Sequence, residues 1–487
     1  MTLARPFPDG TVPALIVTGA CLAAGLGVAL ANAPREAWLL LLLAMAALGL
    51  VVAVQRGLVS PAAVLLVALL SANYNVIVNY NAFVAGALPV ARLITPVATA
   101  GLCLVAVQQA ASLRARSVAF RFGAADAIVG LLLFAATLAL LHGLLAGNPR
   151  SYVLGDFGQL LQVGAAYAAV RLFWLNNGTE AMRSLIFLLC LSWGLRAAAE
   201  FAMPSQRGVW TIVLEGETLF RRTDTLGPLT IPFMLAFGLS ERRPATRLVI
   251  LACLSLVALQ NVFGFTRAHY LALSLVLPIT LLAALGSGEV RHRAVLLVYA
   301  TLLVALLLAA AVPAAHHWAR QTGERFLETF DADTQSRLHR EAETRLVLRQ
   351  IENDPVVGRG LGFVYDGVDP FTFRRVPAHF IHNDYLALWL RGGLPLLLSW
   401  GLLLGYAVLR GFARGDSSAL GPLVAAGAAS GLLAEAIAAV PSGSAFGYIA
   451  GPVLALLVVV ATPAAREARS VTRERILVTR DSISRTA

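Results

Sequence analysis

Long apolar runs alternate with short polar segments along most of this chain. A helix needs about 20 predominantly apolar residues to cross the hydrocarbon core of a bilayer. Runs of this kind predict membrane-spanning helices at residues 12–31, 37–55, 58–72, 88–109, 124–146, 152–174, 182–203, 224–239, 246–263, 268–286, 294–314, 383–409, 419–440 and 446–462. The pattern therefore predicts an all-α polytopic membrane protein with about 12 to 14 transmembrane helices.

One long polar interval, residues 315–382, interrupts this pattern. Within it, residues 334–353 repeat apolar positions at helical spacing, with Asp333 or Thr334 as the N-cap and Asp354-Pro355 after the end. We expect this helix to lie across the mouth of the bundle. Its predicted apolar face consists of Leu338, Ala342, Leu346, Val347 and Ile351. The interval is thus expected to form one large loop that contains short helices.

The chain divides into five parts on this reading. They are N-terminal spans (1–180), central spans (181–314), the polar loop (315–382), C-terminal spans (383–462) and a basic tail (463–487). The central spans carry the arginines that are discussed below.

Composition supports the membrane assignment. The 487 residues are 58% hydrophobic and only 13% charged, with a mean hydropathy of +0.75, whereas soluble domains carry roughly 25% charged residues. The net charge of +11 comes from arginine, since lysine is absent, and it is spread over many short loops. That distribution is typical of membrane topology and argues against a nucleic-acid partner. The four cysteines stand singly in apolar runs, which predicts neither a disulfide framework nor a metal site.

The arginine-rich loops also predict an orientation. Short cytoplasmic loops retain positive charge, and fourteen spans place the arginine-rich loops and the N-terminus on one side. The loop 315–382 then faces the other side, with nine arginines against ten acidic residues. Five residues that could carry chemistry are predicted to share this outer side: Arg221, Arg222, Arg267, His379 and His382.

Two histidines precede the helix that is predicted to begin at Asn383. His379 and His382 lie at the end of the polar loop, where a neutral imidazole can accept a proton from a sugar hydroxyl. The alternative is that an interfacial histidine only bonds a carbonyl oxygen. Their spacing does not suit one helical face, and no acidic cluster accompanies them, so no metal site is expected here.

Three arginines are candidate phosphate ligands. Arg267 separates two apolar runs in a connection too short to place it in bulk water, and an arginine at that depth is costly unless it serves a polar cavity. Arg221 and Arg222 stand directly before the predicted span 224–239 and enter it from the same side. A planar guanidinium suits phosphate or pyrophosphate, although snorkelling to lipid headgroups remains an alternative.

The acidic residues give weaker signals. Asp331-Ala-Asp333 imitates a metal-binding D-x-D motif, but it precedes a helix, where acidic residues are expected in any case. Asp126, Asp156 and Glu435 lie in or near spans, where they either line a proton path of a transporter or are buried and hydrogen-bonded. We expect neither a metal nor another cofactor.

Three glycines follow the predicted loop helix: Gly358, Gly360 and Gly362. A phosphate-binding glycine loop precedes a helix, so these residues do not predict a nucleotide site. They predict a tight turn that brings the loop back over the bundle.

These segments together resemble a known family. RLVLRQIENDPVVGRGLGF (345–363) and HNDYLALWLRGGLP (382–395) resemble the signature of the O-antigen ligase and O-antigen polymerase superfamily. Arg222, ahead of Gly227-Pro228, and Arg267 at the start of a span extend the likeness. The resemblance implies a bacterial inner-membrane glycosyltransferase. It would transfer a glycan from an undecaprenyl-diphosphate carrier to an acceptor, such as lipid A-core, on the periplasmic face without a metal.

The resemblance also implies roles for individual residues. His382 matches the family's catalytic histidine, and Arg222 and Arg267 match the arginines that hold the pyrophosphate. We further expect four neighbouring residues to contact the substrate, namely Arg221, His379, Asn383 and Tyr385. Leu396 stands where the ligase pattern has a second glycine, so a polymerase of the same superfamily stays open. A non-enzymatic transporter of lipid-linked glycans also stays open.

Overall fold

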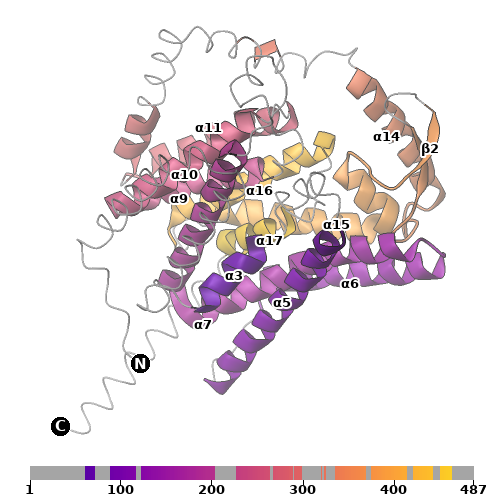
Figure 1. The fold of residues 1–487 in the computed structure, drawn as a ribbon, viewed down its shortest axis with the longest axis horizontal. Coiled ribbons are helices and arrows are strands. Elements are labelled where there is room, and N and C mark those ends of the chain that lie inside the picture. Colours follow the sequence, from indigo (N-terminus) through magenta and orange to yellow (C-terminus); the bar gives the residue numbers. More distant parts are fainter. Residues whose placement is uncertain are drawn as a thin grey trace, which may run out of the picture.

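The computed structural model describes most of the chain from residue 61 to residue 462. The described residues are 61–71, 88–116, 122–202, 226–263, 267–288, 290–298, 320, 323–324, 335–368, 374–413, 420–442 and 450–462. The predicted spans 12–31 and 37–55, most of 294–314, and both Arg221 and Arg222 lie outside them. Within them the chain is a helical bundle with one two-stranded sheet (Figure 1).

The helices follow the predicted apolar runs closely. They are α3 (Pro61–Ser71), α5 (Leu88–Ala115), α6 (Ala124–Leu145), α7 (Arg150–Ala202), α9 (Gly227–Ser240), α10 (Pro244–Phe263), α11 (Arg267–Gly286), α14 (Gln335–Asn353), α15 (Asp384–Ala413), α16 (Pro422–Ser442) and α17 (Ala450–Ala461). Seven helices in the described part are long and apolar enough to cross a membrane, and α9 and α17 are shorter apolar helices. Helix α7 contains two predicted spans, 152–174 and 182–203, joined at Gly178 with a φ of +82°.

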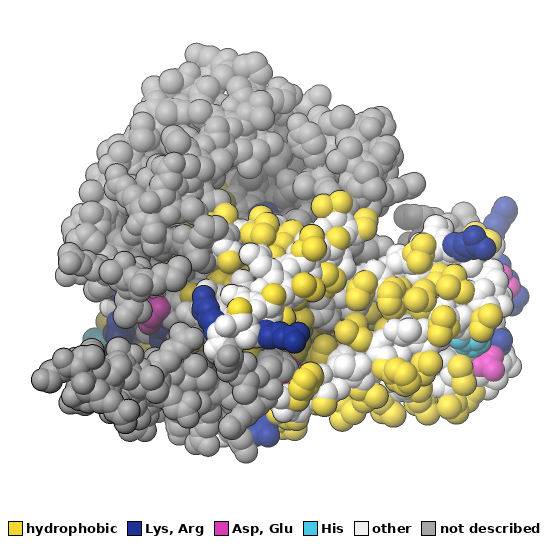
Figure 2. All heavy atoms as spheres, turned by 90° about the horizontal axis from the view of Figure 1, so that it is seen from below, with side chains coloured by type: hydrophobic (Ala, Val, Ile, Leu, Met, Phe, Trp, Pro, Cys, Tyr) yellow, Lys and Arg dark blue, Asp and Glu magenta, His cyan; other side chains and the backbone are white. Residues whose placement is uncertain are grey.

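The outer surface of the bundle is apolar. Figure 2 shows one face on which hydrophobic side chains are spread widely over the described surface. Leu104 and Val107 of α5, Phe134 of α6 and Leu282 of α11 are all more than 60% exposed. Such side chains are costly in water but favourable in lipid. The described part of the chain is therefore a multi-pass membrane bundle.

Several arginine-bearing loops meet at one end of this bundle. Arg293 donates to the carbonyl oxygens of Leu239 and Glu241, at 3.1 Å each, and so caps the end of α9. Arg183 lies 4.0 Å from the Glu241 carboxylate and donates to the carbonyl oxygen of Leu420 at 3.3 Å. We call this the arginine end.

The polar loop lies at the opposite end, which we call the loop end. Figure 1 shows α14 and β2 on the same side of the bundle as the tip formed by the end of α6 and the start of α7. Strands β1 (Tyr365–Val368) and β2 (Arg375–Ala378) pair antiparallel, with Tyr365 opposite Ala378. This hairpin was not predicted, because the sequence led us to expect only short helices in the loop.

Helix α14 has the predicted bounds but not the predicted face. It runs from Gln335 to Asn353, just before Asp354-Pro355. Val347 and Ile351 are buried as expected, but Leu338 is 48% exposed, whereas His339 and Glu343 are only 7% and 5% exposed. The face turned inward is therefore rotated from the predicted one, and the prediction for Leu338 is wrong. The rotation buries polar side chains, which is favourable only because Glu343 finds partners, described below.

The glycine-punctuated segment after α14 packs between two parts of the bundle. At a kink in α15, where Gly393 has a φ of +66°, Arg359 N–H donates to Leu390 O at 2.6 Å and Leu394 N–H to Val356 O at 3.0 Å. On its other side, the segment touches Gly143 of α6 so closely that a Cβ on Gly360 would lie 2.4 Å from the Gly143 Cα. The predicted tight turn over the bundle is confirmed.

Replacing Gly360 by alanine is expected to lower the thermal unfolding midpoint of the detergent-solubilised protein more than replacing Gly147. Both glycines have positive φ, +81° and +76°, which costs an alanine about 1–3 kcal/mol. A Cβ on Gly147 meets nothing within 4 Å, whereas one on Gly360 meets the α6 backbone. Equal midpoints for the two variants would contradict the close packing of this segment against α6.

Candidate functional site

A carboxylate–imidazole pair lies at the loop end. Glu343 of α14 places Oε2 3.0 Å from Nδ1 of His382, and the same oxygen accepts the His382 backbone N–H at 3.1 Å. The Glu343 side chain is 7% exposed and the His382 side chain is 34% exposed. The histidine is therefore anchored on its buried side while its ring remains open to solvent.

Tyr365 of β1 completes the support of this pair. Its hydroxyl lies 3.0 Å from Glu343 Oε1 and 3.0 Å from the carbonyl oxygen of Phe380. Burial, with the Glu343 carboxylate beside it, raises the pKa of Tyr365, so the hydroxyl stays a donor. The Phe380 ring, 57% exposed, meets the His382 ring edge-on with centroids 5.0 Å apart. The ring of His339 meets it from α14, at 5.7 Å.

This geometry selects one nitrogen of His382 for chemistry. An ionised Glu343 accepts a hydrogen bond from Nδ1–H, which leaves the lone pair of the neutral imidazole on Nε2. Within the described residues, no hydrogen bond to Nε2 is formed. Burial alone would raise the pKa of the Glu343 carboxyl, but its hydrogen bonds with His382 and the histidine's charge outweigh burial, and the pKa lies below the usual 4.5. A neutral imidazole held in this way is arranged as a general base.

The Glu343–His382 contact has a predictable pH dependence. Because the folded pKa of Glu343 is depressed, its stabilising effect is fully present above pH 4.5 and is lost as pH falls through the folded pKa. We expect Glu343→Gln to lower the thermal unfolding midpoint of the detergent-solubilised protein in buffers above about pH 5. There the Glu343 carboxyl is ionised in the folded protein, because its pKa lies below 4.5. The difference from the unmodified protein should shrink in more acidic buffer. A pH-independent difference would contradict the ionised pair.

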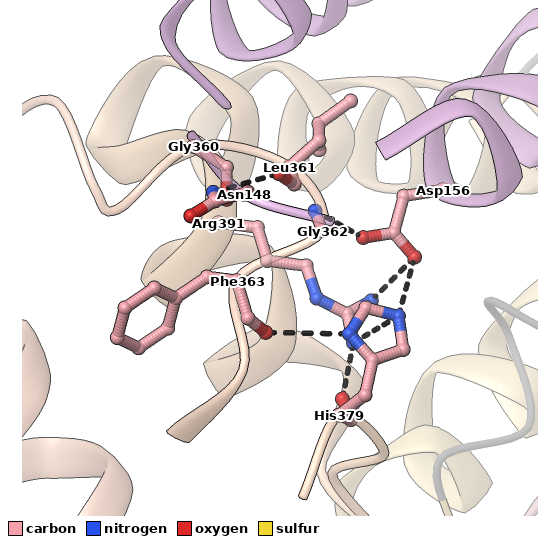
Figure 3. A network of polar contacts seen from close by, with 8 residues as sticks. All are labelled: Asn148, Asp156, Gly360, Leu361, Gly362, Phe363, His379 and Arg391. Carbon is pink, nitrogen blue, oxygen red and sulfur yellow. Dashed lines mark hydrogen bonds and ion pairs between the residues drawn. The ribbon is translucent and has the colours of Figure 1, made fainter. Parts of the chain in front are cut away.

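A second network surrounds His379, three residues before His382 (Figure 3). Asp156 of α7 accepts from three groups: Gly362 N–H at 2.8 Å, Arg391 Nη1 at 3.1 Å and His379 Nε2 at 3.1 Å. His379 Nδ1 lies 3.2 Å from the Phe363 carbonyl oxygen, and its ring stacks on Tyr152 with centroids 4.3 Å apart. Both ring nitrogens of His379 thus face acceptors within the protein.

Asn148, at the tip between α6 and α7, extends this network along the chain. Its side-chain amide approaches the carbonyl oxygens of Arg359, Gly360 and Leu361 at 3.0, 3.4 and 2.9 Å. Figure 3 shows that Asn148 and Asp156 both bond the backbone of the segment 359–362. The N-terminal helices therefore take a direct part in holding the loop.

The structure places the other predicted site residues as follows. Asn383 Oδ1 accepts the Leu386 N–H at 3.1 Å and caps α15, and the Tyr385 hydroxyl donates to Ala436 O of α16 at 2.9 Å. Arg267 is the first residue of α11, but the described part of the structure does not include its side chain. Arg221 and Arg222 lie wholly outside the described part.

The start of α11 nevertheless points toward the loop end. Ala272 of α11 shares a buried cluster with Ala438 of α16, and the Ala284 side chain near the end of α11 packs with Leu423 at the start of α16. The two helices are therefore antiparallel, and the Tyr385–Ala436 bond joins the later part of α16 to the start of α15. This places the backbone of Arg267 toward the same end as His382.

Four residues of the site were not predicted as such. Glu343, Tyr365 and Arg391 drew no prediction, and Asp156 was considered only as a proton-path or buried acid. A signal for Glu343 exists in the sequence: His339, Glu343, Val347 and Ile351 repeat every four residues, which marks one face of α14. No comparable local signal links Asp156 to Arg391, since 235 residues separate them.

Comparison with known proteins adds no assignment. No family model matches the chain, and no curated protein matches it. Among the described residues, no group of three or more His, Cys, Asp or Glu side chains is placed to hold a metal ion.

Proposed function

We propose that this protein is an O-antigen ligase-like glycosyltransferase of the bacterial inner membrane. It would transfer a glycan from an undecaprenyl-diphosphate carrier to an acceptor hydroxyl, on lipid A-core or a similar molecule, at the periplasmic face. The observation that carries the proposal is the Glu343–His382 pair at the loop end of a membrane bundle. The resemblance of residues 345–363 and 382–395 to the superfamily signature supports it independently.

The proposed reaction inverts the configuration at the anomeric carbon. His382 Nε2 accepts the proton of the acceptor hydroxyl as its oxygen bonds to that carbon, while the bond from the carbon to the phosphate oxygen breaks. Undecaprenyl diphosphate leaves with the electron pair. The negative charge of the Glu343 carboxylate, held beside Nδ1, stabilises the imidazolium that forms.

The leaving diphosphate needs positive charge at the same end of the bundle. Arg222 and Arg267 are the proposed ligands, because a guanidinium stabilises developing phosphate charge most strongly in a site from which water is excluded. The placement of the start of α11 toward the loop end is compatible with this role for Arg267. The proposal needs no metal ion.

Turnover without a membrane tests this function. The purified protein in detergent would receive donor lipid extracted from cells that lack the gene, together with lipid A-core. We expect release of undecaprenyl diphosphate and a product enlarged by one glycan. A ladder of longer lipid-linked glycans would instead identify the polymerase alternative. No turnover in detergent, combined with movement of the donor across proteoliposome membranes, would overturn the enzyme in favour of a transporter.

A further inference from the structure

The four residues from His379 to His382 are fixed at three successive points. Arg391 Nη2 donates to the His379 carbonyl oxygen at 2.5 Å, Tyr365 approaches the Phe380 carbonyl oxygen at 3.0 Å, and His382 N–H donates to Glu343 at 3.1 Å. The last two anchors belong to the polar loop itself. The first belongs to a network that reaches across to the N-terminal helices.

Asp156 is the centre of that network. Its carboxylate binds the His379 ring directly and also orients Arg391, whose second nitrogen bonds the His379 backbone. The Asp156 and Arg391 side chains are 7% and 10% exposed, so both are largely removed from water. Removing Asp156 would cut the contact with the His379 ring and would also leave Arg391, which bonds the His379 backbone, without the carboxylate that orients it.

We propose that Asp156 is a positioning residue for the transfer reaction, which fixes the His379–His382 turn and thereby the catalytic imidazole. The inference rests on the proposed function, because it assigns Asp156 a role only through His382. A general base must meet the acceptor hydroxyl within hydrogen-bonding distance, and a displacement of about 1 Å can cost a hundredfold in rate. The α6–α7 part of the chain, which has no family motif, thus completes the site.

Asp156→Asn is the informative variant. The amide has nearly the same shape, but both Asp156 oxygens accept hydrogen bonds, so the NH₂ group faces a donor in either orientation. We expect kcat for glycan transfer to fall at least about tenfold, with KM for the donor changed by less than about twofold. Donor lipid extracted from gene-deleted cells, with lipid A-core as acceptor, serves as the probe.

Asp126→Asn provides a closely matched control. Like Asp156, Asp126 accepts a hydrogen bond from a glycine N–H (Gly123, 2.7 Å) and one from an aromatic side chain, the Tyr167 hydroxyl (2.9 Å). It also pairs with a buried arginine (Arg171, 2.5 Å). It lies at the start of α6, about 30 Å from the tip by the rise of a 22-residue helix. This variant should lose similar thermal stability but keep both kcat and KM.

A second measurement does not depend on transfer. Diethyl pyrocarbonate modifies accessible neutral imidazoles, and tryptic peptide 376–391 contains both His379 and His382. In the unmodified protein, His382 should be modified faster, because both ring nitrogens of His379 are engaged and its ring is stacked on Tyr152. In Asp156→Asn, the rate at His379 should rise several-fold, and in Asp126→Asn it should not change.

The outcomes separate the two claims. A kcat for Asp156→Asn equal to that for Asp126→Asn, or unchanged labelling of His379, would overturn the positioning role. Full transfer by His382→Ala would instead overturn the proposed function. Should Asp156→Asn fold poorly, His379→Gln keeps the Asp156–Arg391 ion pair and the Arg391 bond to the backbone carbonyl, but removes the imidazole with its contacts to Asp156, Phe363 and Tyr152. It should lower kcat several-fold, and an unchanged kcat would also overturn the role.

Discussion

Replacing His382 by alanine should lower the rate of glycan transfer by about 10²–10⁴-fold, which is the usual contribution of a positioned general base. The loss should appear in kcat, since the imidazole acts on the hydroxyl during bond formation. Transfer would be measured in proteoliposomes with donor lipid from gene-deleted cells. Membrane insertion should be unchanged, whereas the thermal unfolding midpoint should fall modestly, because the buried Glu343 carboxylate loses the His382 ring but keeps its contacts with the backbone N–H of residue 382 and with Tyr365.

His292→Ala serves as the matched control for this variant. His292 is an exposed histidine next to Arg293 at the arginine end, far from the proposed site. It should retain full activity. Equal activities for the two alanine variants would remove His382 from the mechanism, whatever Glu343 does for the fold.

Replacing Arg391 by methionine should destabilise the protein by about 3–5 kcal/mol, the typical cost of leaving one partner of a buried ion pair uncompensated. The variant leaves the Asp156 carboxylate without its guanidinium and releases the carbonyl oxygen of His379. The thermal unfolding midpoint in detergent would measure the loss.

The double variant Asp156→Asn/Arg391→Met tests the cause of that loss. Removing the orphaned charge should restore part of the lost stability, so that the double variant is more stable than Arg391→Met alone. Arg410→Met, on the same helix but near its other end, should have a much smaller effect because Arg410 makes no ion pair among the described residues. A double variant less stable than both single variants would contradict the buried pair.

Much of the bundle could be predicted from local signals. Apolar run lengths and helix-ending residues gave the bounds of α6, α10 and α11 to within two residues. The Asp354-Pro355 stop gave the end of α14, since the residue before a proline avoids helical geometry. The inward face of α14 was predicted correctly at Val347 and Ile351 but wrongly at Leu338, because apolar periodicity cannot anticipate that the Glu343 carboxylate is buried against His382.

The site itself was predictable only in part. His382 stands at a recognisable place, directly before the cap of α15 at Asn383, and the family resemblance selects it over His379. Its partner Glu343 lies 39 residues away and the Asp156–Arg391 pair spans 235 residues. Tertiary packing alone brings such residues together, and hydrophobic periodicity carries no information about it.

The separation of Asp156 from Arg391 also sets an order of events during synthesis. At about 5–20 residues per second, the ribosome delivers Arg391 roughly 10–50 s after Asp156, since Arg391 comes 235 positions later in the chain. Until then the Asp156 carboxylate, which is largely buried in the folded protein, has no guanidinium partner, and an unpaired charge at such a position is costly. The insertion of α15 is therefore the step at which Arg391 neutralises the Asp156 charge and bonds the backbone of His379 in the loop.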